Sequence, residues 1–301
     1  MARYLTVGHL LVEDAVLLDG RQARDSLGGD ALYAAIGARA FADDVELVAR
    51  LGRGFPPELV RALEDAGYGA GLIPSEHPTI RLWIEWGVEG GSRYTFHKDA
   101  GTYDQATPAP EEIPAALMGR LEAVHVAPVP FDRMEALARW ARPRARVLTL
   151  DPHYEHVAGM EAEWRRLLPL VDAFLPSRDE AAMLLGSWPG DEEAARALAS
   201  LGALLVCIKL GAEGAIGFRA ADGLVVRMPA WSADPVDPTG CGDAFCGGFL
   251  VGLTETGDLR TAMAHGVVAA AFVAEDHGAA HALTVNREEA RQRLAALLEA
   301  F

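Results

Sequence analysis

The chain has 301 residues, half of them hydrophobic, and carries 43 acidic against 27 basic side chains, which gives a formal net charge of −16. A surface this acidic repels phosphate backbones and anionic lipids, so we expect neither nucleic-acid nor membrane binding. No apolar run approaches the roughly 18 residues that a membrane span needs.

The cysteines and the opening residues indicate a compartment. An odd number of cysteines without Cys-x-x-Cys spacing, at Cys207, Cys241 and Cys246, is typical of a reducing environment. His9 and Glu13 interrupt the opening apolar run and no small-residue cleavage site follows, so this segment predicts a first strand rather than a targeting signal. We therefore expect a cytoplasmic protein.

Short β-rich runs alternate with helical runs along most of the chain. Strands are predicted at residues 3–10, 45–52, 123–129, 146–152, 173–177 and 204–211. Helices are predicted between them, at residues 31–42, 56–67, 132–142, 161–171, 178–186 and 191–202. Such alternation implies right-handed β-α-β units. We therefore expect one α/β domain over residues 1–301, with a doubly wound, mostly parallel sheet and helices on both faces.

Other segments break this rhythm. Residues 79–87 and 92–98 alternate like a hairpin, and residues 13–22 look like a further short strand pair. These pieces do not fit inside a doubly wound sheet, so they predict a small second sheet that stands off the main one. Residues 214–219 and 224–230 predict another hairpin.

The segment VDPTGCGDAFCGGF, residues 236–249, predicts a glycine-rich loop that opens a helix. The N–H groups of Gly240, Cys241 and Gly242 lie at the helix N-terminus, where they favour an anion. The carboxylate of Asp243 cannot serve as an anion ligand there. It does suit a base that takes a proton from a hydroxyl while the amides hold a phosphoryl group. The segment therefore predicts a phosphotransferase site; the plain alternative is an Asp N-cap on an ordinary turn.

Other motifs are missing or weak. No Walker A sequence and no Gly-x-Gly-x-x-Gly at a helix start occurs, which argues against P-loop NTPases and dinucleotide dehydrogenases. His153 and His156 are residues that bind metals, but no third ligand is evident. His9, His125 and His265 are expected to be packed or capping residues.

The segment DPTGCGDAFCGGF resembles the C-terminal signature of the ribokinase-like, phosphofructokinase-B type carbohydrate kinases, which usually read Asp-x-Thr-Gly-Ala-Gly-Asp. Further segments resemble the family in the same order over nearly all of the chain: GHLLVED, LGGDALYAA, PSRDEAAMLLG, IKLGAEGAIGF and HGAAHAL. The resemblance implies a ribokinase-like fold with a β lid formed by residues of about 11–24 and 79–98. It also implies ATP and Mg²⁺ as cofactors, and it allows a monovalent cation and a homodimer formed through the lid.

The resemblance implies a role for individual residues. Asp243 would be the general base, with the amides of Gly240, Cys241 and Gly242 as the anion hole. Residues expected near the nucleotide are Lys209, Gly211, Gly214, Thr239, Ser177 and Gly278. Residues expected near the acceptor are Glu13, Asp14, Gly28, Gly29, Asp30 and Tyr33. Glu180 would lie near the Mg²⁺ and its water molecules.

Some positions depart from the family pattern. Ser177 stands in place of an Asn, Cys241 in place of an Ala, and Tyr33 in place of an Asn that often contacts a sugar hydroxyl. The family's substrate Asp aligns as easily with Glu13 as with Asp14. Successive side chains of a strand point to opposite faces, so only one of these two can face the substrate.

Several residues carry a structural alternative or a further expectation. Lys209 can be a strand-end lysine, Glu180 a charge in the first turn of a helix, and Asp30 an N-cap. Cys241 at a helix N-terminus predicts a reactive thiol with a lowered pKa. Two tryptophans of one strand, in RLWIEW, lie on opposite faces, so one should face the acceptor pocket or a partner subunit and the other should not.

The sequence therefore predicts an ATP- and Mg²⁺-dependent kinase that phosphorylates a hydroxyl of a small neutral acceptor. The VGH of the first strand and Tyr33 resemble the inositol-kinase branch, so a cyclitol such as myo-inositol is expected first, then a pentose or hexose, then a nucleoside. Carboxylates at Glu13, Asp14 and Asp30 argue against a phosphorylated acceptor. A non-catalytic sugar or nucleotide sensor is the alternative from another class, although a binder has no need of the base Asp243.

Overall fold

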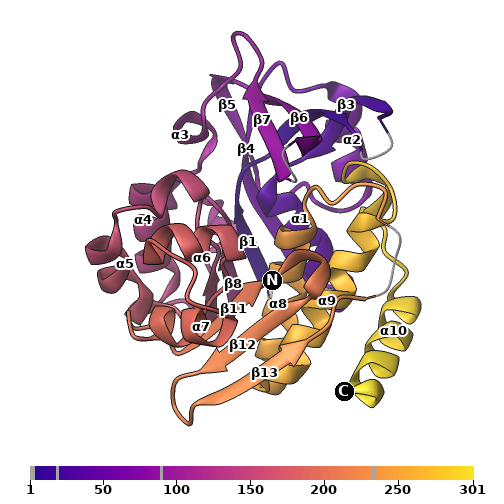
Figure 1. The fold of residues 1–301 in the computed structure, drawn as a ribbon. Helices are drawn as coiled ribbons and strands as arrows, with labels where there is room; N and C mark the ends of the chain where they lie inside the picture. Colours follow the sequence, from indigo (N-terminus) through magenta and orange to yellow (C-terminus); the bar gives the residue numbers. More distant parts are fainter. Residues whose placement is uncertain (1–3, 18–19, 89–90, 232–234) are drawn as a thin grey trace.

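A computed structural model, shown in Figure 1, describes residues 4–17, 20–88, 91–231 and 235–301. Its main sheet has nine strands in the order β13-β12-β11-β10-β9-β8-β1-β4-β5. The strands are β1 (Tyr4–Gly8), β4 (Val45–Arg53), β5 (Leu72–Pro78), β8 (Leu121–Val126), β9 (Ala145–Leu150), β10 (Ala173–Phe174), β11 (Leu205–Lys209), β12 (Ala215–Arg219) and β13 (Leu224–Met228). Neighbours from β5 to β11 pair in parallel, and β12 and β13 close one edge as an antiparallel hairpin.

Helices cover both faces of this sheet. One face carries α1 (Asp30–Arg39), α2 (Pro57–Asp65), α8 (Cys241–Thr256), α9 (Leu259–Ala274) and α10 (Arg287–Ala300). The other carries α4 (Phe131–Ala141), α5 (Glu161–Leu167), α6 (Arg178–Leu185) and α7 (Asp191–Ala199). Figure 1 shows α4 to α7 on one side of the molecule and α8 to α10 on the other. Strand β1 is buried along its whole length, with Tyr4 in one core and Leu5 in the other, as expected for a parallel strand covered on both faces.

Four strands form a separate small sheet, which lies at the top of Figure 1. Its order is β3-β2-β6-β7, with β2 (Leu11–Val16), β3 (Gln22–Gly28), β6 (Ile80–Val88) and β7 (Gly91–Phe96). The prediction of a second sheet is confirmed, and β3 runs four residues past the expected end at residue 24, to Gly28. Residues 18–19 and 89–90, in the predicted turns, lie outside the described residues.

Some elements were not predicted from the sequence. Strand β5, with the sequence LIPSEHP, contains two prolines and no alternation, and the sheet accepts it because it is an edge strand. Helix α9 is apolar nearly all round because it is buried nearly all round, so it carries no amphipathic pattern. The predicted strand at 173–177 is regular only over Ala173–Phe174, with one further bridge from Ser177 to Lys209. The predicted hairpin at 214–230 is confirmed as β12 and β13. Among the described residues, no helix has the length and apolar character needed to cross a membrane.

Two glycines bring the backbones of α1 and α8 into direct contact. A Cβ atom at Gly37 would overlap the carbonyl oxygen of Ala244, and one at Gly247 would overlap that of Ala34. The two helices therefore cross with their backbones in contact. Asp30, the first residue of α1, accepts a hydrogen bond from the amide of His9 just after β1, so the start of α1 lies at the carboxyl ends of the central strands. Ligands of open α/β sheets bind at these ends.

Candidate active site

A cavity of about 830 Å³ opens at the carboxyl ends of β1, β9, β10 and β11. Six carboxylate side chains line it: Glu13, Asp30, Asp151, Asp179, Glu180 and Asp243. Two cationic side chains among the described residues also line it, Arg178 and Lys209. The cavity can therefore hold a cation and polar hydroxyl groups.

A second cavity of about 410 Å³ adjoins the first, and the two share lining residues that include Lys209, Gly211 and Gly242. Its wall is otherwise mainly apolar, with Trp231, Phe245, Val267 and Ala271. Gly211 and Gly214, which were expected along the nucleotide, line this second cavity. Gly242 lies between a polar cavity and a mainly apolar one, an arrangement that suits a phosphate chain between an acceptor and a nucleobase.

The first turn of α8 forms the partition. Gly240 has a φ of 75°, which glycine adopts without strain, and a Cβ there would overlap the ring of Tyr33. The N–H of Cys241 donates to the Pro238 carbonyl at 3.2 Å, so this amide of the expected anion hole already has a partner. The neighbouring Gly242 faces both cavities and keeps the position of an anion-binding residue.

Asp243 projects into the larger cavity from this turn. Burial, together with the nearby carboxylates of Asp30 and Asp151, raises the pKa of Asp243 well above its ordinary value. A carboxylate that holds a proton more tightly is better suited to take one from a hydroxyl. The geometry agrees with the role of general base that the family resemblance implies.

Lys209, at the end of β11, forms a buried cluster with two residues that the sequence analysis did not select. Its ammonium group forms an ion pair with Asp151 and lies 3.6 Å from the Cys246 sulfur. Burial by itself would lower the pKa of Lys209, but the Asp151 carboxylate raises it above its ordinary value. Asp151 directly follows the buried strand β9, and a polar residue at that position was the available signal.

The residues present fit a Mg²⁺ ion. Oδ1 of Asp151 is buried and has no hydrogen-bond partner among the described residues, although Oδ2 is paired. Glu180 uses one oxygen to accept the Ser177 amide at 2.7 Å, and the Ser177 hydroxyl accepts the Glu180 amide at 3.3 Å. This capping box explains why serine replaces the usual Asn without loss of the helix start. Carboxylate oxygens are the ligands Mg²⁺ prefers, so Asp151 and Glu180 could hold it directly or through water.

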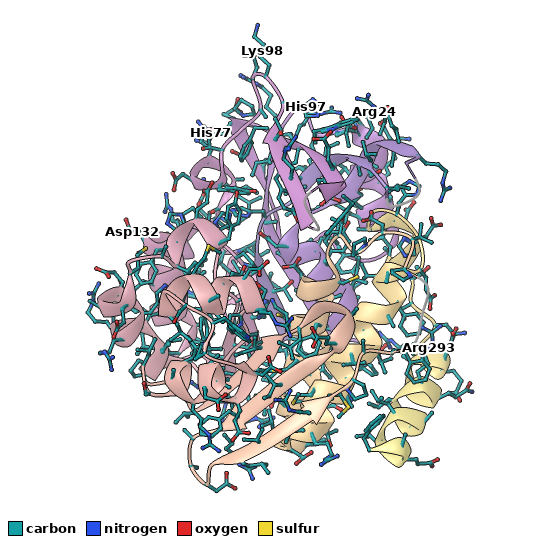
Figure 2. All side chains as sticks on the ribbon, in the orientation of Figure 1. Arg24, His77, His97, Lys98, Asp132 and Arg293 are labelled. Atoms are coloured by element: carbon teal, nitrogen blue, oxygen red, sulfur yellow. The ribbon has the colours of Figure 1, made fainter. Side chains whose placement is uncertain are left out.

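At the other end of the cavity, the structure distinguishes Glu13 from Asp14. Glu13 lines the cavity, and its Oε2 accepts the Tyr33 hydroxyl at 2.9 Å. Asp14 points to the opposite face, 3.0 Å from His97 and 3.7 Å from Arg24. Figure 2 shows Arg24 and His97 near the top of the molecule, on the small sheet. Asp14 is thus corrected from an acceptor residue to a structural residue of the small sheet.

Burial gives Glu13 unusual properties. It raises the pKa of Glu13 to about 8, against the lowering effect of the Tyr33 hydrogen bond. A Cβ at Gly28 would overlap the Glu13 carboxyl group, so Gly28 makes room for this side chain and does not itself line the cavity. Gly29 lines the cavity with a φ of 124°. With this pKa, the Glu13 side chain is mainly a neutral carboxylic acid at neutral pH, and it can donate a hydrogen bond.

Tyr33, which was expected near the acceptor, does not present a free ring face to the cavity. Its side chain is 1 % exposed, its ring packs under Gly240, and its hydroxyl is occupied by Glu13. Burial raises the pKa of Tyr33 well above its ordinary value, so its hydroxyl keeps its proton. Tyr33 therefore shapes the floor of the cavity.

Aromatic rings elsewhere supply the flat surface. Five of them line the cavity, Trp86, Tyr94, Tyr103, His153 and Tyr154, and we call this set the aromatic wall. The His153 ring stacks on Tyr154 with centroids 4.7 Å apart and meets Tyr103 edge-on at 4.5 Å. The wall draws on strands β6 and β7, on α3 (Tyr103–Ala106) and on the loop after β9. Three of these segments follow one another in the sequence and the fourth lies some distance further on, so the wall forms only in the folded chain and no local pattern predicted it.

Three further expectations need correction or completion. Burial raises the pKa of Cys241 to about 12, and the carboxylates of Asp237 and Asp243 add to this, so the expected lowering is wrong. Gly278 lines neither cavity and instead contacts Ser26 of β3. Thr239 lines the cavity and accepts a hydrogen bond from Trp86.

The histidines can also be placed. Glu155 brings a third potential metal ligand within 4.8 Å of those of His153 and His156, which the sequence did not make evident. His125 and His265 are buried and hydrogen-bonded to Thr149 and to the Thr261 carbonyl, as expected of packed residues.

A model of the "pfkB family carbohydrate kinase" matches residues 3–286 of the chain. The chain belongs to this family. A cytidine kinase of Thermococcus kodakarensis is 28 % identical over 85 % of this chain and 90 % of its own length. An ATP-dependent ribose-1-phosphate kinase of Halopiger xanaduensis is 25 % identical over 95 % of this chain and 96 % of its own. The solved structure of a ribokinase II from E. coli with ATP and Mg²⁺ has a TM-score of 0.75 at 17 % identity, and the match covers 98 % of this chain and 100 % of that one.

The fold expected from the sequence is confirmed by this likeness, and the family defines the chemistry in outline. The protein is a carbohydrate or nucleoside kinase of the pfkB family, and ATP binding is implied by that membership.

Proposed function

We propose that the protein transfers a phosphoryl group from ATP to a hydroxyl of a neutral nucleoside. The observation that carries the proposal is the aromatic wall, which lines the same 830 Å³ cavity as Asp243. Stacking of a nucleobase on an aromatic ring contributes about 1–3 kcal/mol. A cyclitol or free sugar has no flat π face and gains less from such a wall.

Glu13 and Asp30 are the hydroxyl-binding groups in this proposal. Both line the acceptor end of the cavity, and Glu13, with its pKa of about 8, can donate as well as accept a hydrogen bond. A hydrogen bond to a carboxylate such as that of Asp30 contributes about 1.5–3 kcal/mol, and one to a neutral acid such as Glu13 about 0.5–1.5 kcal/mol. Two adjacent hydroxyls of a ribose would thus each have a partner. The Asp30 carboxylate lies near enough to Asp243 to raise its pKa, so a hydroxyl held by Asp30 lies close to the base.

The remaining roles follow the geometry around α8. Asp243 would take the proton of the acceptor hydroxyl, and the Gly242 amide at the helix N-terminus would stabilise charge on the transferred group. Mg²⁺ at Asp151 and Glu180 would neutralise charge on the ATP phosphates. The apolar 410 Å³ cavity suits the adenine base.

The charges of the cavity favour a neutral acceptor. Lys209 is paired with Asp151, and Arg178 is paired with Glu213 at 2.7 Å. Among the described lining residues, no further Arg or Lys is present to hold an acceptor phosphate. Asp14 faces away from the cavity and adds no charge to it, so the paired state of these cations is what favours a neutral acceptor. The relationship to a cytidine kinase supports it, whereas the ribose-1-phosphate kinase marks the competing class.

A cyclitol such as myo-inositol is the second candidate, favoured by the two adjacent carboxyl groups of Glu13 and Asp30.

A homodimer through the small sheet is also proposed. Tyr94 and Phe96 of its edge strand β7 are 44 % and 41 % exposed, which is high for aromatic side chains.

The test is a mass-spectrometric screen of ATP with nucleosides, sugars and cyclitols, with Asp243→Asn as the blank. A nucleoside should give the highest kcat/KM. Tyr154→Leu, at an exposed wall position, should raise KM for the nucleoside by about fivefold or more and leave KM for ribose within about twofold. Trp140→Leu on α4, outside the cavity, is the matched control. A cyclitol or sugar phosphate as best acceptor, or no ADP release with any acceptor as in a sensor, would contradict the proposal.

A further inference from the structure

His9 follows β1 directly and is completely buried behind the acceptor end of the cavity. Its backbone N–H donates to Oδ1 of Asp30 at 2.7 Å, and its ring nitrogen Nδ1 lies 2.8 Å from Oδ2 of the same carboxylate. One residue thus holds both oxygens of Asp30. The Asp30 side chain is 13 % exposed, and it lines the cavity while His9 does not.

The other side of the His9 ring contacts the segment that carries Tyr103. Its Nε2 lies 2.7 Å from the Thr107 hydroxyl, which also lies 2.7 Å from the Tyr103 carbonyl. The imidazole and Tyr103 rings are 5.0 Å apart at an angle of 34°. Tyr103 in turn meets Phe96 of β7 edge-on at 5.2 Å. His9 therefore connects the acceptor carboxylate, the aromatic wall and the small sheet.

Packing alone does not account for a polar ring at this position. A buried ring nitrogen without a partner costs about 1–3 kcal/mol, and both nitrogens of His9 have partners. The surrounding backbone is fitted to the pair, since a Cβ at Gly8 would come within 2.8 Å of Oδ1 of Asp30 and one at Gly29 would overlap the His9 carbonyl oxygen. The two glycines leave room for the His9–Asp30 contacts, and these contacts orient the Asp30 carboxylate.

We propose that His9 is a positioning residue that sets acceptor affinity and acceptor choice. It fixes the Asp30 carboxylate toward the acceptor hydroxyls and fixes Tyr103 as part of the surface against the acceptor ring. His9 itself is not among the residues that line either cavity. The inference rests on the proposed function, because Asp30 is taken there as the hydroxyl-binding group.

The test compares two substitutions that each reproduce one half of the imidazole. In His9→Asn the side-chain amide occupies the place of Nδ1 and can still donate to Asp30, but it does not reach Thr107. In His9→Gln the amide reaches the place of Nε2 near Thr107 and leaves Asp30 without its ring donor. His265→Gln, in the buried helix α9, is the control for loss of a buried histidine away from the cavity.

Kinetics should be measured with whichever acceptor gives the highest kcat/KM, so that the test holds even if the nucleoside assignment fails. His9→Ala should raise KM for the acceptor by about tenfold or more and leave KM for ATP within about twofold. KM for the acceptor should be at least about threefold lower in His9→Asn than in His9→Ala, and His9→Gln should lower it less. His265→Gln should leave the KM values for acceptor and ATP within about twofold of those of the original protein.

Acceptor binding serves as a second readout for variants that fold poorly or show no turnover. Calorimetric Kd values of the acceptor, without ATP, should follow the same order in every variant that unfolds cooperatively. Thr107→Val keeps the Asp30 contact, so it should weaken acceptor binding less than His9→Ala does. Parallel changes in the affinities for acceptor and ATP, or equal effects of His9→Asn and His9→Gln, would overturn the proposal.

Discussion

The indole N–H of Trp86, on strand β6 of the small sheet, donates a hydrogen bond of 2.9 Å to the hydroxyl of Thr239, in the loop before Asp243. The small sheet therefore touches the loop that carries the candidate base. Trp83 lies on the opposite face of the same strand, where the Arg24 guanidinium covers its ring at 4.3 Å. Only one of the two tryptophans contacts the cavity, as the alternation in the sequence predicted.

The first prediction uses this pair. Acceptor binding should change the tryptophan fluorescence, and Trp86→Phe should remove most of the change because its ring lines the cavity. Trp86→Phe should also raise KM for the acceptor by about threefold or more, since the Thr239 hydroxyl loses its donor. Trp83→Phe is the matched control. An equal loss of signal in both variants would contradict a small sheet that closes over the acceptor.

The second prediction concerns pH and Glu13. Burial raises the pKa of Glu13 from 4.5 to about 8, so between these pH values the folded protein keeps a proton that the unfolded chain has lost. The free energy of unfolding should therefore fall as the pH rises through this window, by up to a few kcal/mol, on the order of 1.4 kcal/mol per pH unit. In Glu13→Gln, which imitates the protonated acid, the fall should be smaller. Urea unfolding at pH 5, 6.5 and 8 gives the slope of the free energy of unfolding against pH for the original protein and for Glu13→Gln. Equal slopes in the two proteins would show that Glu13 titrates normally.

The third prediction concerns Cys241. Because burial raises the pKa of Cys241 to about 12, little thiolate is present at pH 7. Iodoacetamide should inactivate the enzyme slowly, with a rate that rises with pH, and Cys241→Ala should keep kcat within about threefold. Rapid inactivation at pH 7 that nucleotide prevents and Cys241→Ala abolishes would restore the reactive thiol expected from the sequence.

The fourth prediction tests the metal ligands. Asp151→Asn removes a charge from the buried pair with Lys209 and weakens the unpartnered Oδ1 as a ligand. The Mg²⁺ concentration for half-maximal rate should rise by about tenfold or more. Cys246→Ala changes the same cluster without changing a carboxylate, so its Mg²⁺ requirement should stay within about twofold of the original. An unchanged requirement in Asp151→Asn would remove Asp151 from the metal site.

The residues expected on the nucleotide side come from short motifs that are local in the sequence. Gly240, Gly242 and Asp243 lie at one helix start, and Ser177 and Glu180 lie at another, so the residues of each motif stay together in the fold. Gly278 failed because its segment folds against β3 instead of the cavity wall. The alternation of strands and helices likewise predicted most of the main sheet. It did not predict helix α9, because α9 is buried nearly all round and so has no amphipathic pattern.

The acceptor side could not be predicted in the same way. Glu13 and Asp14 are neighbours in one strand, and only the position of the small sheet decides which faces the cavity. His9 reads as a packed residue until Asp30 and Thr107 are brought to its two ring nitrogens. The pKa of Cys241 depends on burial and on neighbouring carboxylates, which outweigh the helix N-terminus that the sequence showed.

The most direct test of the account is the rate of phosphoryl transfer in Asp243→Asn. The asparagine keeps the size of the side chain but cannot take a proton, so a single-turnover measurement with bound ATP and the best acceptor isolates the base. The account predicts a fall of at least about 100-fold in the transfer rate, with the Kd for ATP within about twofold. A variant that retains more than about a tenth of the original rate, with chemistry still limiting, would show that Asp243 is not the general base.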